Sequence, residues 1–212
     1  MSSVSPVSAS PKQRGIKRAL NAASRSPAAV FLRELAANPR EVGAVWPSSR
    51  RLARHMAAAV PLDESRKIVE LGGGTGAITE ELLARGIPPH QLIVVERSPA
   101  LVAVLRERFP RVRIVEGDAM HLSTLLRAED QVGVVVSGLP LRSLPPRVVA
   151  TIIREASRVL PPGGLFVQFT YRLSPQRSLS QRFAALSSRV VWGNIPPARV
   201  WAFVNRRLAE TV

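Results

Sequence analysis

The chain has 212 residues, 46% of them hydrophobic, and a formal net charge of +15. This length suits one domain with an extension, and the composition supplies enough apolar residues for a core. The absence of cysteine excludes disulfides and thiolate metal sites, and no apolar run approaches the roughly 18–20 residues that span a bilayer. The three histidines are scattered along the chain, so we expect no metal site.

The N-terminal quarter is the most basic part of the chain. Residues 1–60 contain ten Lys or Arg and two Glu. Residues 12–25 are predicted to form a helix with an apolar face, which consists of Ile16, Ala19, Leu20 and Ala23. The opposite face is basic, with Arg14, Lys17, Arg18 and Arg25. Because a basic amphipathic helix binds an anionic membrane surface or a partner, we predict membrane contact; a solvated helix and RNA contact are the alternatives.

Two further elements are expected before the first strand. Ser26 and Pro27 are predicted to begin a second helix, because serine caps helices and proline is favoured in their first turn. Residues 41–49 form a predicted loop, and another helix is expected to begin near Ser48 or Ser49. Trp46 in this loop would cover a ligand pocket or act as a simple packing anchor.

A glycine-rich loop follows the first predicted strand. The apolar residues Ile68, Val69 and Leu71 suit a buried strand, which contains Glu70 near its end. The loop that follows has the sequence Gly-Gly-Gly-Thr-Gly over residues 72–76. Glycine allows a tight turn and lets the backbone approach a ligand, and the next helix begins with unpaired N–H groups. This pattern predicts a nucleotide-type ligand at residues 72–76.

Two more acids are predicted at the ends of neighbouring strands. Residues 92–95 are apolar and lead to Glu96, which lies 20 residues after Gly76, where nucleotide-binding folds place the acid that binds ribose hydroxyls. Residues 112–115 form a third run, which places Asp118 at a strand end within reach of an adenine amino group. Since the carboxyl ends of parallel strands share one edge of a sheet, these acids predict an α/β ligand site.

The rest of the chain predicts the remaining strands of an α/β sheet. A fourth apolar run, residues 132–136, ends in Ser-Gly-Leu-Pro-Leu over 137–141. Residues 165–171 form a predicted fifth strand after a Pro-Pro-Gly-Gly turn. Two closing strands are expected at 190–192 and 199–204, separated by a Gly-Asn-Ile-Pro-Pro segment.

These residues resemble the S-adenosylmethionine-dependent methyltransferases of the Rossmann-like class I. Residues 70–76 look like the first motif of that class. The resemblance implies a seven-stranded, mostly parallel sheet with a C-terminal antiparallel hairpin and an N-terminal helical extension. It implies S-adenosylmethionine as the cofactor, held by Glu70, Gly72, Gly74, Gly76, Glu96, Asp118 and Ala119.

NAD is the alternative cofactor. Gly72, Gly74 and Ala77 also fit the dinucleotide fingerprint. However, an acid directly before the glycines suits the amino-acid end of S-adenosylmethionine better than a pyrophosphate. The chain is also too short for the substrate domain that NAD enzymes usually add.

Four segments resemble the bacterial phospholipid N-methyltransferases, which are themselves similar to rRNA adenine dimethylases. These segments are residues 43–49, 137–141, 167–171 and 194–201. The resemblance implies methylation of phosphatidylethanolamine, once or several times, towards phosphatidylcholine. It implies a cytoplasmic protein that is peripheral on the inner face of the cell membrane. Residues 1–60 would then contact the membrane and cover the pocket, and 61–212 would form the methyltransferase domain.

Two other functions stay open beside lipid methylation. An RNA adenine-N6 methyltransferase would carry an Asn/Asp-Pro-Pro-aromatic loop, whereas residues 137–141 lack both the Asn and the aromatic. Flipped bases need stacking, and only 5% of the residues are aromatic, so the sequence argues against nucleic acid as the partner. A protein that binds S-adenosylmethionine without catalysis is the other alternative.

The proposed chemistry needs a proton acceptor and a site for the lipid phosphate. An ethanolamine amine must lose a proton before it can attack, and Tyr171 or Ser137 through a water are candidate acceptors, as is solvent. Aromatic faces, including Trp46, Tyr171 and Trp192, would hold methylated intermediates by cation–π attraction. Candidates for the phosphate site are Arg142, Arg172 and Arg199, since arginine pairs with phosphate in a bidentate way. Leu139 in the loop after the fourth strand is a further candidate for the substrate site.

Overall fold

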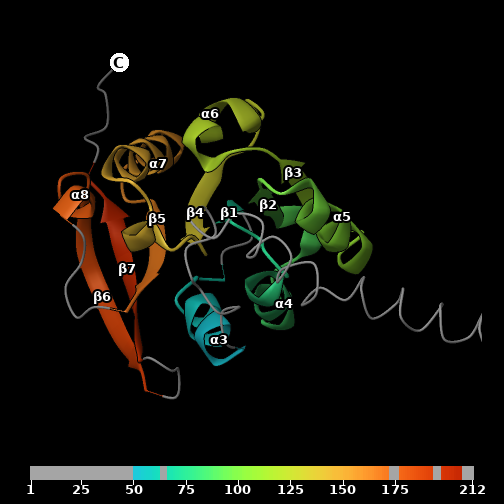
Figure 1. The fold of residues 1–212 in the computed structure, drawn as a ribbon, viewed down its shortest axis with the longest axis horizontal. Coiled ribbons are helices and arrows are strands. Elements are labelled where there is room, and N and C mark those ends of the chain that lie inside the picture. The colour runs from blue at the N-terminus through green and yellow to red at the C-terminus, as the bar shows by residue number, and fades with distance from the viewer. Residues whose placement is uncertain (1–49, 63–65, 172–176, 193–196, 207–212) are drawn as a thin grey trace, which may run out of the picture.

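A seven-stranded sheet with helices on both faces forms the centre of the computed structural model (Figure 1). The structure describes residues 50–62, 66–171, 177–192 and 197–206. The strand order is β3-β2-β1-β4-β5-β7-β6. Their bounds are β1 (Lys67–Leu71), β2 (Leu92–Glu96), β3 (Arg113–Glu116), β4 (Val132–Ser137), β5 (Leu165–Thr170), β6 (Phe183–Val191) and β7 (Ala198–Asn205).

The sheet is parallel from β3 to β5, and β7 is antiparallel to both β5 and β6. The predicted mostly parallel sheet with a closing hairpin is therefore confirmed. Because β6 runs antiparallel to β7, and β7 to β5, the strands β5 and β6 end at the same edge as the other parallel strands. The carboxyl ends of β1 to β6 therefore lie at one edge of the sheet, together with the start of β7. Open α/β sheets bind ligands at this edge.

Helices cover both faces of the sheet. One face carries α3 (Arg50–Ala58), α4 (Ala77–Ala84) and α5 (Pro99–Arg108), whose buried side chains pack with one set of strand residues. The other face carries α6 (Leu122–Leu125), α7 (Pro146–Val159) and α8 (Arg177–Ser180). Three short 3-10 helices lie in the connections: η1 (Pro89–Gln91), η2 (Ala119–His121) and η3 (Leu141–Ser143).

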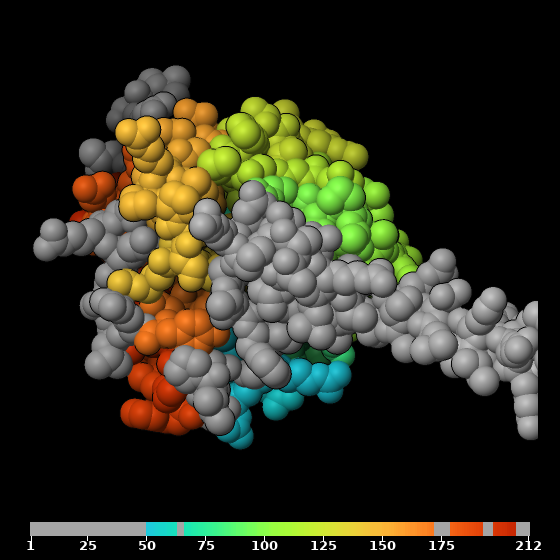
Figure 2. All heavy atoms as spheres, in the orientation of Figure 1, coloured from blue at the N-terminus to red at the C-terminus, as the bar shows by residue number. Residues whose placement is uncertain are grey.

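Helix α3 belongs to the same core as the strands. Leu52 and Met56 are fully buried and pack in one cluster with Val167 of β5 and Val200 of β7. Figure 2 shows α3, in blue, beside the red β6–β7 hairpin. The boundary between residues 60 and 61 stays a prediction. The helices predicted at 12–25 and from Ser26 onward lie outside the described residues and also stay predictions.

The hairpin confirms one predicted strand and corrects the other. Strand β7 matches the prediction for residues 199–204, but β6 begins at Phe183 and not near Val190. The ring of Phe183 is buried and packs 5.1 Å from that of Phe166, which anchors the start of the strand. Residues 185–189 are exposed because β6 is an edge strand, so its middle lacks the alternation that predicts a half-buried strand.

No helix in the described part of the chain combines the length and the apolar composition that crossing a membrane requires. Within those same residues there is also no group of three or more His, Cys, Asp or Glu side chains placed to hold a metal ion.

Candidate functional site

The sheet brings the predicted residues to one edge. Leu71 pairs with Val95 of β2 and with Ser137 of β4, and Ser137 pairs with Gln168 of β5. Glu70, Glu96 and Ser137 therefore lie at the carboxyl ends of three adjacent strands. This is the position that the sequence predicted for a ligand site.

The glycine loop lies in a conformation that only glycine adopts readily. Gly72, Gly74 and Gly76 have φ values of +75°, +54° and +85°. Among the described residues, a Cβ at Gly74 would meet no atom within 4 Å, so space is open beside its backbone. The loop therefore leaves room for a ligand to contact the main chain at Gly74.

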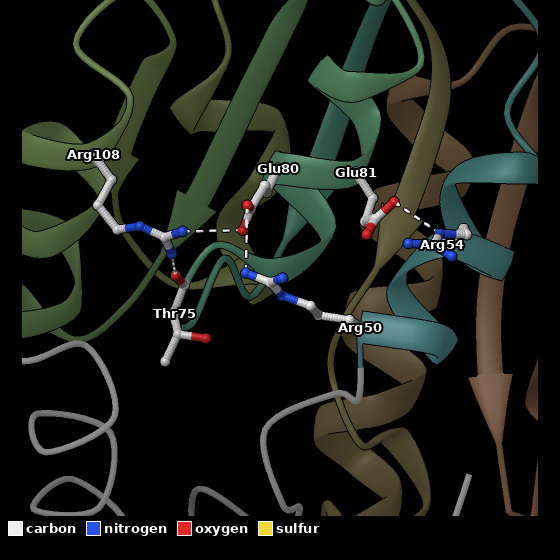
Figure 3. A network of polar contacts seen from close by, with 6 residues as sticks. All are labelled: Arg50, Arg54, Thr75, Glu80, Glu81 and Arg108. Atoms are coloured by element: carbon white, nitrogen blue, oxygen red, sulfur yellow. Dashed lines mark hydrogen bonds and ion pairs between the residues drawn. The ribbon is translucent and has the colours of Figure 1, made fainter. Parts of the chain in front are cut away.

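Arginines fix the far side of this loop. Arg108 of α5 donates to the carbonyl of Thr75 and lies 3.1 Å from a carboxylate oxygen of Glu80 in α4 (Figure 3). Arg50 of α3 lies 3.8 Å from the other oxygen of Glu80. A further pair, Arg54 and Glu81 at 3.4 Å, joins α3 to α4. Arg108 thus links the loop to α5, and the ion pairs link α4 to α3 and α5, although exposed ion pairs such as these each contribute little stability.

Glu96 is held ready to accept further hydrogen bonds. Its Oε2 accepts a hydrogen bond of 2.9 Å from the N–H of Gly74, and its Oε1 accepts one of 2.9 Å from the N–H of Ser98. Each carboxylate oxygen has a second lone pair, so the group can also accept from two vicinal hydroxyls. This geometry fits the predicted role of Glu96 as the ribose acid.

Glu70 is buried beneath helix α4. Its Oε2 accepts a hydrogen bond of 2.6 Å from the hydroxyl of Thr79, whereas its Oε1 has no partner among the residues that the structure describes. Burial raises the pKa of Glu70 to about 8; the hydrogen bond from Thr79 opposes this rise, and the Glu96 carboxylate adds to it. The free protein therefore holds Glu70 mostly neutral at pH 7. A cationic ligand nearby would favour its ionised form.

Asp118 and Ala119 lie directly after β3. Asp118 caps η2, because its Oδ1 accepts a hydrogen bond of 2.8 Å from the N–H of Met120. Its Oδ2 lies 4.0 Å from Arg97. Ala119 is buried, and the N–H of Gly117 donates to the carbonyl of Glu96, which joins the two strand ends. Asp118 keeps acceptor capacity at the predicted adenine position.

The loop after β4 packs directly on the glycine loop. The N–H of Gly138 donates to the carbonyl of Leu71 at 2.8 Å. A Cβ at Gly138 would lie 2.9 Å from the carbonyl oxygen of Gly72, so the two backbones approach too closely for a side chain. The half-buried Leu139 lies against Gly72. Ser137 is fully buried, and its hydroxyl has no hydrogen-bond partner in the described part of the chain.

The other predicted substrate and catalytic residues lie further along the same edge. Tyr171 follows β5 and packs edge-on against Phe169, with ring centroids 5.6 Å apart. Arg142 is exposed in η3. The guanidinium of Arg199 in β7 lies over the ring of Trp201, 5.5 Å from its centroid. Trp46 and Arg172, as well as residues 12–25, lie outside the described residues.

Two residues of this region were missed by sequence reasoning. Thr79 is the hydrogen-bond partner of Glu70, and Gln168 is a buried amide in the middle of β5. A polar residue inside an apolar strand, as in Leu-Phe-Val-Gln-Phe over 165–169, was the available signal for Gln168. Thr79 carried no such signal, since threonine in the first turn of a helix is ordinary.

Three features fit the predicted cofactor S-adenosylmethionine. The open space beside Gly74 accommodates a ligand against the backbone, and Glu96 is placed for ribose hydroxyls. The unpaired Oε1 of Glu70 suits a cationic group. The roles of the individual residues stay predictions.

Comparisons with known proteins agree with this fold. Residues 68–164 match the family described as "Methyltransferase domain". The chain is 37% identical over 146 residues to the ornithine lipid N-methyltransferase of Singulisphaera acidiphila, which covers 66% of this chain and 76% of that protein. It is 30% identical over 160 residues to the ribosomal RNA small subunit methyltransferase A of Parasynechococcus marenigrum, covering 71% of this chain but about half, 52%, of that protein.

Solved structures share the fold at low sequence identity. TrmN from Thermus thermophilus has a TM-score of 0.64 at 19% identity, over 78% of this chain and 51% of that one. The N-methyltransferase NodS from Bradyrhizobium japonicum, in complex with S-adenosyl-L-homocysteine, has a TM-score of 0.60 at 17% identity, over 81% and 97%. The fold is thus that of the class I methyltransferases, and the chain belongs to the S-adenosylmethionine-dependent methyltransferase family.

Proposed function

We propose that this methyltransferase transfers methyl groups to the primary amine of a membrane lipid, with phosphatidylethanolamine as the substrate, towards phosphatidylcholine. The observation that carries the choice of acceptor is the loop after β4. Leu141 follows Pro140 and is buried in the core, so the loop presents no aromatic face on which a base could stack. The similarity to a protein named as a lipid N-methyltransferase, over 76% of its length, supports the same conclusion.

The chemistry asks the protein to orient a neutral amine. S-adenosylmethionine supplies a methyl group on a sulfonium, which is a good leaving group. The residues of the chain must then hold the amine in line, accept or relay its proton and exclude water. Ser137 offers a buried hydroxyl at the end of β4, and Tyr171 offers a phenol at the end of β5. A neutral hydroxyl can accept the amine proton only while it passes its own proton on, so Tyr171, or Ser137 through a water, would relay the proton to solvent.

The described surface supports docking on an anionic membrane. Trp192 follows β6 at the carboxyl edge and is 79% exposed, and tryptophan favours the membrane interface. Arg51 of α3 and Arg189 of β6 lie near His55, whose pKa is lowered by burial and by these arginines together with Arg54. The positive charge of these arginines would add to that of the basic helix predicted at 12–25. We propose a cytoplasmic protein that binds the inner face of the cell membrane.

Methyl transfer from labelled S-adenosylmethionine tests the substrate. One reaction contains vesicles with phosphatidylethanolamine, and a parallel reaction contains unmodified ribosomal RNA. We expect label in the lipid fraction, and chromatography of the products resolves one, two or three added methyl groups. Label in the RNA alone would replace the lipid proposal with adenine-N6 methylation.

Deleting residues 1–25 should weaken membrane binding and spare cofactor binding. The deletion removes a basic face that would contribute about 1 kcal/mol per Lys or Arg near an anionic surface. We expect sedimentation with anionic vesicles to need at least about tenfold more lipid, and the wild-type protein to lose binding as salt rises. The control Arg182→Gln changes an exposed arginine at the other end of the hairpin. Unchanged sedimentation of the deletion variant would refute the role of residues 12–25.

A further inference from the structure

Four buried polar atoms without partners gather on one face of the sheet. Among the described residues, Ser137 Oγ, Gln168 Oε1, Arg199 Nε and Trp201 Nε1 are buried and make no hydrogen bond. Ser137 pairs in register with Gln168, and Gln168 with Trp201, so their side chains lie on the same face. Arg199 lies two residues from Trp201 and therefore shares that face. Unpaired buried polar groups are costly, so the row of Ser137, Gln168 and Trp201, with Arg199 beside it on the same face, favours a polar ligand.

A small pocket opens beside this row. Its lining includes Gln168, Thr170 and Trp201 from the strands and Leu141 and Arg142 from η3. Its volume is about 250 Å³ including the open mouth. The enclosed part of the pocket has room for about one water molecule, so a larger polar group would lie at its open mouth.

The amide of Gln168 is oriented by its neighbours. Its Nε2 donates to the carbonyl of Leu139 at 3.0 Å and to that of Phe169 at 2.8 Å. Because both partners are acceptors, the amide cannot be turned over without losing both bonds. Gln168 is 3% exposed, and its Oε1 is thus fixed as a buried, unpaired acceptor.

The acceptors and the donors of the row lie on different strands. Its acceptors, Ser137 Oγ and Gln168 Oε1, belong to β4 and β5, next to the loop that packs on the glycine loop. Its donors, Trp201 Nε1 and Arg199 Nε, belong to β7, one strand farther from the cofactor side. Adjacent strands are about 4.8 Å apart, a distance that a short chain between an amine and an oxyanion can bridge.

We propose that this row and pocket hold the head group of the amine lipid. Gln168 Oε1 and Ser137 Oγ accept from its amine, and Arg199 and Trp201 Nε1–H bind its oxyanion. Arg142 at the pocket adds a second positive charge. The proposal rests on the proposed function and defines its substrate class as an amine joined by a short chain to an anionic oxygen group. That group is a phosphodiester in phosphatidylethanolamine and a carboxylate in an ornithine lipid.

Soluble head groups test the pocket without catalysis. The ¹⁵N–¹H indole signals of the full chain report on its three tryptophans, and Trp201→Phe identifies the signal of Trp201. We expect O-phosphoethanolamine to shift this signal saturably, with a Kd that rises at least about fivefold in Arg199→Gln. The matched control is Arg182→Gln, which should keep the wild-type Kd. A parallel titration with ornithine shows whether phosphate or carboxylate binds more tightly.

Kinetics on vesicles give the second readout. Trp201→Phe keeps an aromatic ring and removes only the N–H donor, so it should raise the KM for phosphatidylethanolamine about three- to tenfold. The Kd for S-adenosylmethionine, measured by calorimetry, should not change in Trp201→Phe or in Arg199→Gln.

The outcomes separate the two proposals. If the wild type methylates phosphatidylethanolamine but both variants keep its KM and no indole signal moves, the pocket is refuted and the proposed function stands. If the Trp201 signal shifts with either head group and no lipid is methylated, the pocket stands and the proposed function fails.

Discussion

Replacing Glu96 with alanine should weaken S-adenosylmethionine binding about 100-fold. Hydrogen bonds to a charged group contribute roughly 1.5–3 kcal/mol each, and the ribose hydroxyls would lose their carboxylate acceptor. The same change leaves the N–H groups of Gly74 and Ser98 without their partner, which loosens the glycine loop. Isothermal titration calorimetry at pH 7 measures the effect directly.

A neighbouring acid provides the control for this prediction. Glu116 pairs in register with Glu96, but its side chain is exposed at the end of β3. Glu116→Ala removes the same charge from the same edge and should change the Kd by less than about threefold. Equal affinities for Glu96→Ala and the wild type would exclude Glu96 from the cofactor site.

Glu70 should make the free protein less stable as the pH rises. Its pKa is about 8 in the folded protein, against 4.5 for a glutamate side chain in water, so folding favours the protonated form. The unfolded chain then binds fewer protons than the folded one between these values. Stability is therefore highest below the lower value and declines as the pH rises to about 8, beyond which the loss is constant. Between pH 6 and 9 the loss amounts to about 3 kcal/mol.

The variant Glu70→Gln isolates this contribution. Glutamine does not titrate, so urea unfolding at pH 6, 7, 8 and 9 should show a shallower decline for the variant than for the wild type. The difference between the two curves cancels the other titrating groups. Glu107→Gln, which changes an exposed acid of α5, should keep the wild-type decline. Parallel curves for wild type and Glu70→Gln would mean that Glu70 is ionised in the folded protein across this range.

The strands and acids of the cofactor half were predictable because their signals are local. An apolar run followed by an acid or glycine indicates a strand end, and parallel strands bring such ends together. Glu96 and the glycine loop therefore lie where the sequence placed them. The fifth strand and β7 were also predicted within one residue at each end.

The part of the sheet proposed to bind the methyl acceptor, at the ends of β4, β5 and β7, was harder to predict. Its features depend on contacts between distant segments. Ser137, Gln168 and Trp201 form a row only through the pairing of three strands. The early start of β6 depends on the packing of Phe183 against Phe166, 17 residues earlier in the chain. The hydrogen bond between Glu70 and Thr79, although close in sequence, depends on how α4 lies on the sheet.

The match to the methyltransferase domain family ends between β4 and β5, in the middle of the sheet. The segment shared with the methyltransferase domain family ends at residue 164, and β5 begins at Leu165. The acids at the ends of β1 to β3 lie before this seam, and Gln168, Arg199 and Trp201 lie after it. Ser137 and Arg142 of the proposed acceptor site lie before residue 165, and Leu52 and Met56 pack with Val167 and Val200, so an exchange of residues 165–205 must keep these contacts. Chimeras joined between residues 164 and 165 are a practical starting point for engineering acceptor specificity.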